Sequence, residues 1–225
     1  MQEIYKKVLN NRIITSVFIT VSAFVFYSCC SVELQNLSDA KERVQQYYEN
    51  GQYDHDLNKV IKDAKEKFSK VEVKQNSAVV FDVDDTVLLN YDASKKMGFG
   101  YVKDISDKWV SSAKVPAIPQ VKDLYDYLLS RNIKIIFLTG RFNNEYDYTY
   151  QNLVNEGYAK FDTLIVRKPE EQKLSAVEFK SNVRTELTKQ GYEIIGNVGD
   201  QWSDLEGPYS GIKIKIPNYL YLIED

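Results

Sequence analysis

The most constraining feature of the sequence is an apolar run, Ala78-Val79-Val80-Phe81, that leads directly into Asp82-Val83-Asp84-Asp85-Thr86. A short run of this kind predicts a strand buried on both faces of a sheet. Because side chains alternate along a strand, Asp82 and Asp84 are expected to project to the same side at its carboxyl end. Carboxylates are unfavourable there unless they are paired, hydrogen-bonded or bound to a metal. The pattern therefore predicts a cation site that also carries chemistry.

Short apolar runs alternate with helical segments through the rest of the chain. Strands are expected at 78–83, 133–138, 163–166, 193–198 and 212–216, with helices near 119–131, 144–156 and 175–190. This alternation predicts an α/β fold, a Rossmann-like three-layer α/β/α arrangement with a mostly parallel five-stranded sheet. In such folds ligands bind beyond the carboxyl ends of the strands.

A helical extension is expected before the first strand, over about residues 38–70. Apolar residues recur there with helical spacing, which predicts an amphipathic helix, and Asn50-Gly51 separates it from an earlier helix that begins near Ser38. The stripe consists of Leu57, Val60, Ile61, Ala64 and Phe68.

The composition is that of one globular domain, expected over residues 31–225. Hydrophobic residues make up 44% of the chain and charged residues 27%, and we find no internal repeat or flexible linker. The net charge is −3, and since the first thirty residues contribute +2, the remainder carries −5. An acidic body offers no electrostatic footprint for a nucleic acid polymer or for an anionic membrane surface.

Residues 1–30 are expected to be an export signal rather than part of the fold. Lys6, Lys7 and Arg12 precede twenty uncharged residues, and both cysteines of the chain, Cys29 and Cys30, lie near the end of that stretch. A cysteine at this place resembles a lipidation site of bacterial lipoproteins, and an uncleaved membrane anchor is the alternative. Both readings predict an exported, membrane-tethered protein of the bacterial cell envelope.

Polar clusters follow the other predicted strands. Thr139-Gly140-Arg141 follows the second strand and is expected to be a tight turn, and Asp200 and Asp204 follow the fourth. Lys180, near the start of a helix, could face the same point. Carboxylates, a hydroxyl and a lysine at one crevice suit a divalent cation and a phosphoryl group, and oxygen ligands favour Mg²⁺ over zinc.

Together these motifs resemble the haloacid dehalogenase (HAD) superfamily of phosphohydrolases. The residues around these motifs are similar to one group within the superfamily. This group contains the lipoprotein (class C) acid phosphatases, the plant acid phosphatases and the vegetative storage proteins. The similarity extends from about residue 38 to the end of the sequence. The matching segments are Phe-Asp-Val-Asp-Asp-Thr-Val-Leu (81–88), Ala-Ile-Pro (117–119), Leu-Thr-Gly-Arg (138–141), Phe-Lys-Ser-x-x-Arg (179–184), Gly-Asp-Gln-Trp-Ser-Asp-Leu (199–205) and Lys-Ile-Pro-Asn-Tyr (215–219).

The resemblance implies a role for each carboxylate. Asp82 would attack phosphorus to form an aspartyl-phosphate, and some storage-protein relatives have lost this residue. Asp84 would protonate the leaving alcohol, which requires a neutral carboxyl and therefore a raised pKa. Mg²⁺ would be held by the Asp82 carboxylate, the main-chain carbonyl of Asp84, and Asp200, while Asp204 orients a metal-bound water.

The resemblance also implies a site for the phosphoryl oxygens, formed by Thr139, Gly140 and Lys180. Lys168 competes with Lys180 for the lysine role, and the Lys-Ser-x-x-Arg context favours Lys180. Arg141 is interpreted as a structural residue paired with an acidic loop, with substrate contact as the alternative.

Other residues receive simpler interpretations. Asp85 is a cap or turn residue, Arg184 an ion-pair partner on a helix surface, and His55 a solvated surface residue. A small cap-like insertion is expected at about 87–116, where aromatic side chains could stack on a substrate ring. Those side chains are Tyr91, Phe99, Tyr101 and Trp109.

The predicted activity is Mg²⁺-dependent acid phosphatase action on small phosphomonoesters, with nucleoside monophosphates as one candidate class. A catalytically silent, surface-tethered binding protein with the same fold is one alternative, and a phosphotransferase with the same site is another. The oligomeric state is left open.

Overall fold

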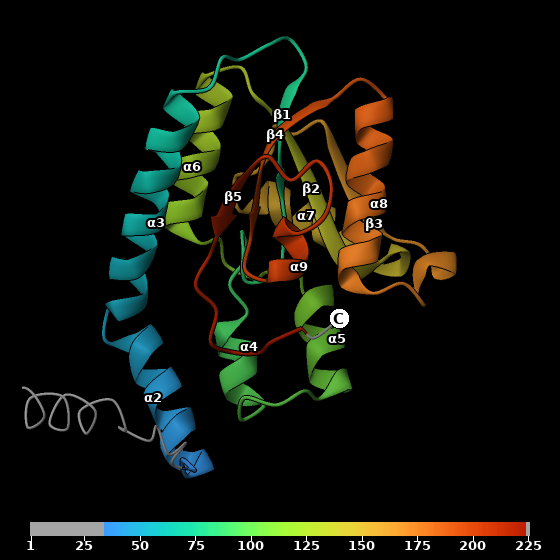
Figure 1. Ribbon diagram of the computed structural model, residues 1–225. Coiled ribbons are helices and arrows are strands. Elements are labelled where there is room, and N and C mark those ends of the chain that lie inside the picture. Colours follow the sequence, from blue (N-terminus) through green and yellow to red (C-terminus); the bar gives the residue numbers. More distant parts are fainter. Residues whose placement is uncertain (1–33, 224–225) are drawn as a thin grey trace, which may run out of the picture. The chain divides into compact units, whose positions relative to one another are not determined.

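The computed structural model describes residues 34–223 of the 225-residue chain (Figure 1). Residues from Ser38 onward form one compact unit. The predicted export signal, with Cys29 and Cys30, lies outside the described residues. Within the described part, no helix is both long enough and apolar enough to cross a membrane.

A five-stranded parallel sheet forms the centre of the fold, which confirms the predicted α/β class. The strand order is β3-β2-β1-β4-β5, and every neighbouring pair is parallel. All residues of the central strand β1 are buried, as its apolar run predicts. The strands are β1 (Ser77–Phe81), β2 (Lys134–Phe142), β3 (Thr163–Arg167), β4 (Glu193–Gly199) and β5 (Ile212–Lys215).

Helices cover both faces of the sheet, as predicted. Val79 and Phe81 belong to the larger core cluster, which includes residues of α3 (Gln52–Ser69) and α6 (Pro119–Ser130). Ala78 and Val80 point to the other face and pack with α8 (Ala176–Lys189). Figure 1 shows α3 and α6 on one side of the sheet and α8 on the other. Alternation along β1 thus builds two hydrophobic layers.

The helical extension is present as α2 (Leu37–Glu49) and α3, and they are separated at Gly51, whose φ of 88° suits glycine. The predicted stripe faces the core, with Leu57, Ile61, Ala64 and Phe68 buried. Phe68 packs so closely on β4 that a Cβ atom at Gly196 would lie 2.6 Å from its ring.

The remaining elements lie between or after the strands. Within the predicted cap-like insertion lie α4 (Tyr91–Lys96) and α5 (Lys103–Ser111), and α9 (Trp202–Leu205) follows β4. After β5 the chain runs without regular structure through residues 216–223, the C-terminal segment. The other helices are η1 (Asn143–Glu145), α7 (Tyr146–Asn155) and η2 (Pro169–Glu171).

One predicted boundary is wrong. The sequence predicts that the second strand ends at 138 and that Thr139-Gly140-Arg141 forms a turn. Instead β2 continues to Phe142, where pairing with Arg167 resumes after an irregularity that begins at Leu138. The irregular pairing explains why the run of apolar residues stops at Leu138 although the strand continues to Phe142.

Candidate active site

Lys180 joins two carboxylates at the carboxyl end of the sheet. Its Nζ donates to Asp82 Oδ1 at 2.6 Å and also to Asp204 Oδ1, and all three side chains are at most 7% exposed. The helix α8 that carries Lys180 begins with a capping box in which Ser175 accepts from the Glu178 amide. The structure therefore brings Lys180 to Asp82, whereas the competing Lys168 is exposed.

Asp200 completes a buried group of three carboxylates with Asp82 and Asp204, whose ligand atoms lie within 4.8 Å of one another. Its Oδ1 accepts from the Thr86 hydroxyl at 3.0 Å. Its Oδ2 accepts from the side-chain amide nitrogens of Gln201 and Asn218, both at 2.6 Å. These donors hold Asp200 in one orientation and compensate part of the cost of its burial.

Asp204 has both oxygens engaged by the protein. Oδ1 accepts from Lys180, and Oδ2 accepts from the Gln201 amide at 2.8 Å. Gly199 makes this arrangement possible, because a Cβ atom there would lie 2.2 Å from Asp204 Cβ. Asp204 thus has the environment of a residue that orients a neighbour, while Asp82 and Asp200 supply hard oxygen donors that fit a divalent cation.

Burial and mutual repulsion shift the pKa values of this group. Burial, together with the charges of Asp204 and Asp85, raises the pKa of Asp200 to about 7. Burial also raises the pKa of Asp82 well above its ordinary value, against the opposing charge of Lys180. The two carboxylates that bind Lys180 raise its pKa in spite of burial. A bound divalent cation would relieve the repulsion among these carboxylates.

Asp84 stands apart from this group and pairs with Arg141. Arg141 Nε donates to Asp84 Oδ2 at 2.9 Å, and its Nη2 donates to Oδ1 at 2.6 Å. Although burial alone would raise the pKa of Asp84, the charge and hydrogen bonds of Arg141 hold it below the ordinary value. The expectation of a raised pKa for Asp84 is therefore wrong for this state. Arg141 thus pairs with the acidic segment that follows β1, and this segment is part of the site itself.

Asn90 links Asp84 to the cap-like insertion. Its Nδ2 donates to Asp84 Oδ1 at 2.9 Å, and its Oδ1 accepts from Trp109 Nε1 at 2.9 Å. Asp85 is a buried turn residue with a φ of 56°, and its Oδ1 accepts from the Asn90 amide. Burial raises the pKa of Asp85 to about 7.

Thr139 and Gly140 sit beside these groups in different ways. Thr139 is fully buried, and its Oγ1 accepts from the Arg141 amide at 3.2 Å. Gly140 is exposed, and a Cβ atom there would meet nothing within 4 Å. Gly140, unlike the Thr139 side chain, lines the cavities described next.

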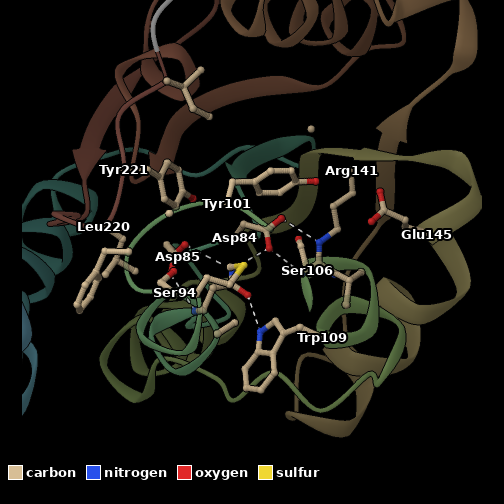
Figure 2. A pocket seen from close by; sticks show the side chains of 18 of the residues that line it. Asp84, Asp85, Ser94, Tyr101, Ser106, Trp109, Arg141, Glu145, Leu220 and Tyr221 are labelled. Carbon is tan, nitrogen blue, oxygen red and sulfur yellow. Dashed lines mark hydrogen bonds and ion pairs between the residues drawn. The ribbon is translucent and has the colours of Figure 1, made fainter. Parts of the chain in front are cut away.

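Two cavities adjoin and share the lining residues Asp84, Gly140, Arg141, Tyr221 and Ile223. The reaction cavity, of about 470 Å³, also contains Asp82, Lys180 and the two carboxylates after β4. The cap cavity, of about 570 Å³, is mainly apolar and reaches into the insertion (Figure 2). Its aromatic lining residues from the insertion are Phe99, Tyr101 and Trp109.

Tyr91, the fourth aromatic residue considered for this role, lies elsewhere. It is buried, stacks on Tyr48 with ring centroids 4.8 Å apart, and donates to Glu49 Oε1 at 2.6 Å. Figure 2 shows Tyr101, Trp109 and Tyr221 around the cap cavity, with Asp84 among them and paired with Arg141. The cavity can therefore enclose a planar or apolar group attached to a phosphate at the reaction cavity.

Sequence reasoning misread Arg184 and missed the C-terminal segment. Arg184 is fully buried and donates to the backbone carbonyls of Asp204, Glu206 and Pro208, so it is not a surface ion-pair partner. Asn218 and Tyr221 of the C-terminal segment contribute to the site. The signal for Asn218 was the Lys-Ile-Pro-Asn-Tyr segment, whereas nothing in the sequence marked Tyr221. His55 is exposed, as predicted.

The parallel α/β fold and the aspartate–lysine centre at its strand ends define a phosphohydrolase of the HAD type. The family model for HAD superfamily, subfamily IIIB (acid phosphatase) matches residues 14–224. The chain belongs to this family of phosphoric monoester hydrolases.

Individual relatives agree with this assignment. "Acid phosphatase 1" of Solanum lycopersicum is 33% identical over 205 residues, covering 85% of this chain and 80% of its own. "Stem 28 kDa glycoprotein" of Glycine max is 37% identical over 189 residues, covering 81% and 74%. The class C acid phosphatase from Bacillus anthracis, solved with tungstate bound, superposes with a TM-score of 0.68 at 24% identity, covering 83% and 86%, and supports the fold.

Proposed function

We propose that this protein is a Mg²⁺-dependent acid phosphatase that hydrolyses small phosphomonoesters through an aspartyl-phosphate on Asp82. The observation that carries the proposal is the buried Asp82, which is paired with Lys180 and grouped with Asp200 within 4.8 Å. Mg²⁺, bound by Asp82, the Asp84 carbonyl and Asp200, would neutralise charge on the phosphoryl group.

In the first step the Asp82 carboxylate attacks phosphorus and the leaving oxygen departs with a proton from Asp84. Lys180 and Gly140, which both line the reaction cavity, stabilise the equatorial oxygens. In the second step Asp84 accepts a proton from water, which attacks the phosphorus and frees Asp82. Because Arg141 holds Asp84 ionised in the resting protein, a proton must reach Asp84 before the first step, and acidic solution favours this.

The cap cavity supports small monoesters with a planar or apolar leaving group, and nucleoside monophosphates are one candidate class. Phe99, Tyr101 and Trp109 can contact such a group while its phosphate occupies the reaction cavity.

The proposal is tested with a generic aryl phosphate and the Asp82→Asn variant. Loss of the nucleophile should reduce kcat by at least about a thousandfold. Asp126→Asn is the matched control, since Asp126 is solvent-exposed and pairs with Lys122 outside both cavities. Activity retained by Asp82→Asn contradicts the assigned nucleophile. Absence of turnover by the unaltered protein across a monoester panel with Mg²⁺ favours the silent binding protein, and phosphate transfer to an added alcohol favours the phosphotransferase.

We further propose that the chain is exported and tethered to a bacterial cell envelope through Cys29 or Cys30. The support is the basic start of the chain, the uncharged stretch after it, and the two cysteines at its end. Mass spectrometry of the N-terminus of membrane-extracted protein tests this, and an unmodified, uncleaved N-terminus contradicts lipidation.

A further inference from the structure

The cations of the reaction cavity are almost all paired with carboxylates. Lys180 binds Asp82 and Asp204, and Arg141 binds Asp84 through two hydrogen bonds. Arg167 lines the same cavity, yet no ion pair joins it to a carboxylate among residues 34–223. Among the described residues, Arg167 is therefore a cation of the cavity wall that no carboxylate pairs directly.

Arg167 is held in place by contacts that do not neutralise it. It is the last residue of β3, its Nη1 donates to the Leu174 carbonyl at 2.9 Å, and its guanidinium lies 4.7 Å from the centroid of the Phe179 ring. Its Nε is buried without a hydrogen-bond partner. An unpaired donor lowers stability in the free protein and is satisfied when an acceptor arrives.

A phosphorylated substrate supplies such an acceptor. Its dianion must enter a cavity that contains four carboxylates and two cations already engaged with them. We propose that Arg167 binds an oxyanion of the substrate in the reaction cavity and is a specificity-determining residue of the reaction. The proposal rests on the proposed function, because the oxyanion belongs to a phosphomonoester.

The oxyanion has two sources, the transferred phosphoryl group and a second anionic group on the leaving group. β3 lies two strands from β1, a separation of about 10 Å. A fully extended arginine side chain could reach the transferred phosphoryl group from there. The side chain in its observed position could equally bind a second anionic group, carried by the leaving group and lying farther from Asp82. Both sources present an anionic oxygen to a planar guanidinium fork.

The test compares Arg167→Gln with the unaltered protein on phenyl phosphate, on carboxyphenyl phosphate, and for inhibition by inorganic phosphate. KM should rise about tenfold while kcat changes by less than about threefold, since a charge-assisted hydrogen bond to the substrate is lost. Arg167→Lys keeps the charge without the fork and should recover part of the affinity. Lys168→Gln is the control, because Lys168 is the adjacent exposed cation outside the cavity.

The outcomes separate the sources. Higher KM for both substrates with weaker phosphate inhibition places the transferred phosphoryl group at Arg167, and higher KM for carboxyphenyl phosphate alone places the second anion there. Unchanged KM and phosphate inhibition in Arg167→Gln overturn the proposal.

If the unaltered protein turns over no monoester, the proposed function fails. Calorimetric binding of inorganic phosphate to the unaltered protein and to Arg167→Gln then still decides whether Arg167 binds an oxyanion. If Arg167→Gln does not fold, the same measurements on Arg167→Lys decide, and affinities equal to the unaltered protein overturn the proposal.

Discussion

Asp82 and Asp84 are two residues apart, yet their surroundings move their pKa values in opposite directions. Lys180 is shared between Asp82 and Asp204, so a single positive charge faces two carboxylates with Asp200 close by. Asp84 is the carboxylate that pairs with the Arg141 guanidinium, and it also accepts a hydrogen bond from the Asn90 side-chain amide. Burial and the ratio of cations to carboxylates therefore shift the two pKa values apart, in a direction opposite to the ionised nucleophile and neutral proton donor that the proposed mechanism needs.

Replacing Arg141 should change the pH dependence of the reaction. In Arg141→Gln the pKa of Asp84 should rise, because the adjacent positive charge that holds it below its ordinary value is removed. Since the proposed mechanism requires the protonated form of Asp84, the alkaline limb of the kcat–pH profile should move to higher pH. Steady-state kinetics between about pH 4 and 9 measure the shift.

Arg131→Gln is the control for this experiment, since Arg131 binds the backbone carbonyls of Phe68 and Val71 away from the site. An alkaline limb that stays in place in Arg141→Gln would contradict the assignment of Asp84 as the proton donor.

The positions of single site residues were predictable where the residues directly follow an apolar run. Asp82 and Asp200 follow apolar runs, so their position beyond strand ends could be inferred. Arg184 could not be placed, because a cation on a helix is ordinarily solvated and its partners are carbonyls of a chain segment with no periodic pattern. The pairing of Arg141 with Asp84 depends on the approach of β2 to the end of β1, which local sequence does not encode.

At the scale of elements, the turn from β4 into α9 depends on a close approach at Gly199. Gly199→Ala should lower the free energy of unfolding by about 1–3 kcal/mol or more, since the new methyl group would overlap Asp204. Chemical denaturation measures the loss, and metal affinity should fall with it because Asp200 is adjacent.

Gly140→Ala is the matched control, because a Cβ atom at Gly140 meets nothing within 4 Å. Its stability should stay within about 0.5 kcal/mol of the unaltered protein. Equal stabilities for the two variants would mean that the contact between Gly199 and Asp204 does not constrain the turn.

The elements were largely predictable because hydrophobic periodicity determines them. The central strand, the α3 stripe and the helix at α8 lie within a few residues of their predicted positions. The end of β2 was not, because its last residues, including an exposed Gly140, pair irregularly and break the apolar run. Periodicity reports burial, and it stops where burial stops even if the strand continues.

At the scale of the whole molecule, the buried carboxylates should make the metal-free protein less stable as pH rises. The pKa of Asp200 and that of Asp85 are each about 7 in the folded protein, against about 3.9 in an unfolded chain. The folded state therefore binds more protons between about pH 4 and 7, and stability falls as pH rises through this window. In chelator, Tm should be several °C lower at pH 7.5 than at pH 5.5.

Mg²⁺ should reverse this loss at pH 7.5, because a bound cation replaces the protons. Asp200→Asn should flatten the pH dependence in chelator and weaken the response to Mg²⁺. The lowered pKa of Asp84 acts below about pH 4 and does not oppose the trend in this window. A Tm that rises between pH 5.5 and 7.5 without metal would contradict the account.

The class of the fold followed from alternating strands and helices, but the closure of the site by the C-terminal segment did not. Asn218 reaches Asp200, Gln201 binds the backbone of Tyr221 and Ile223, and the amide of Tyr219 donates to the Tyr48 hydroxyl. These contacts join chain segments far apart in sequence, and no local pattern specifies such pairs.

The contacts of the C-terminal segment also determine when the site can form during synthesis of the chain. During translation the strand that leads into Asp82 is synthesised before Asn218 and Tyr221. A growing chain therefore contains Asp82 long before Asn218 can orient Asp200 and before Tyr221 can line the two cavities. Any chain that stops short of Asn218 lacks these contacts even if its sheet has formed. The contacts that orient Asp200 and line the two cavities therefore form only after the segment that follows β5 has been made.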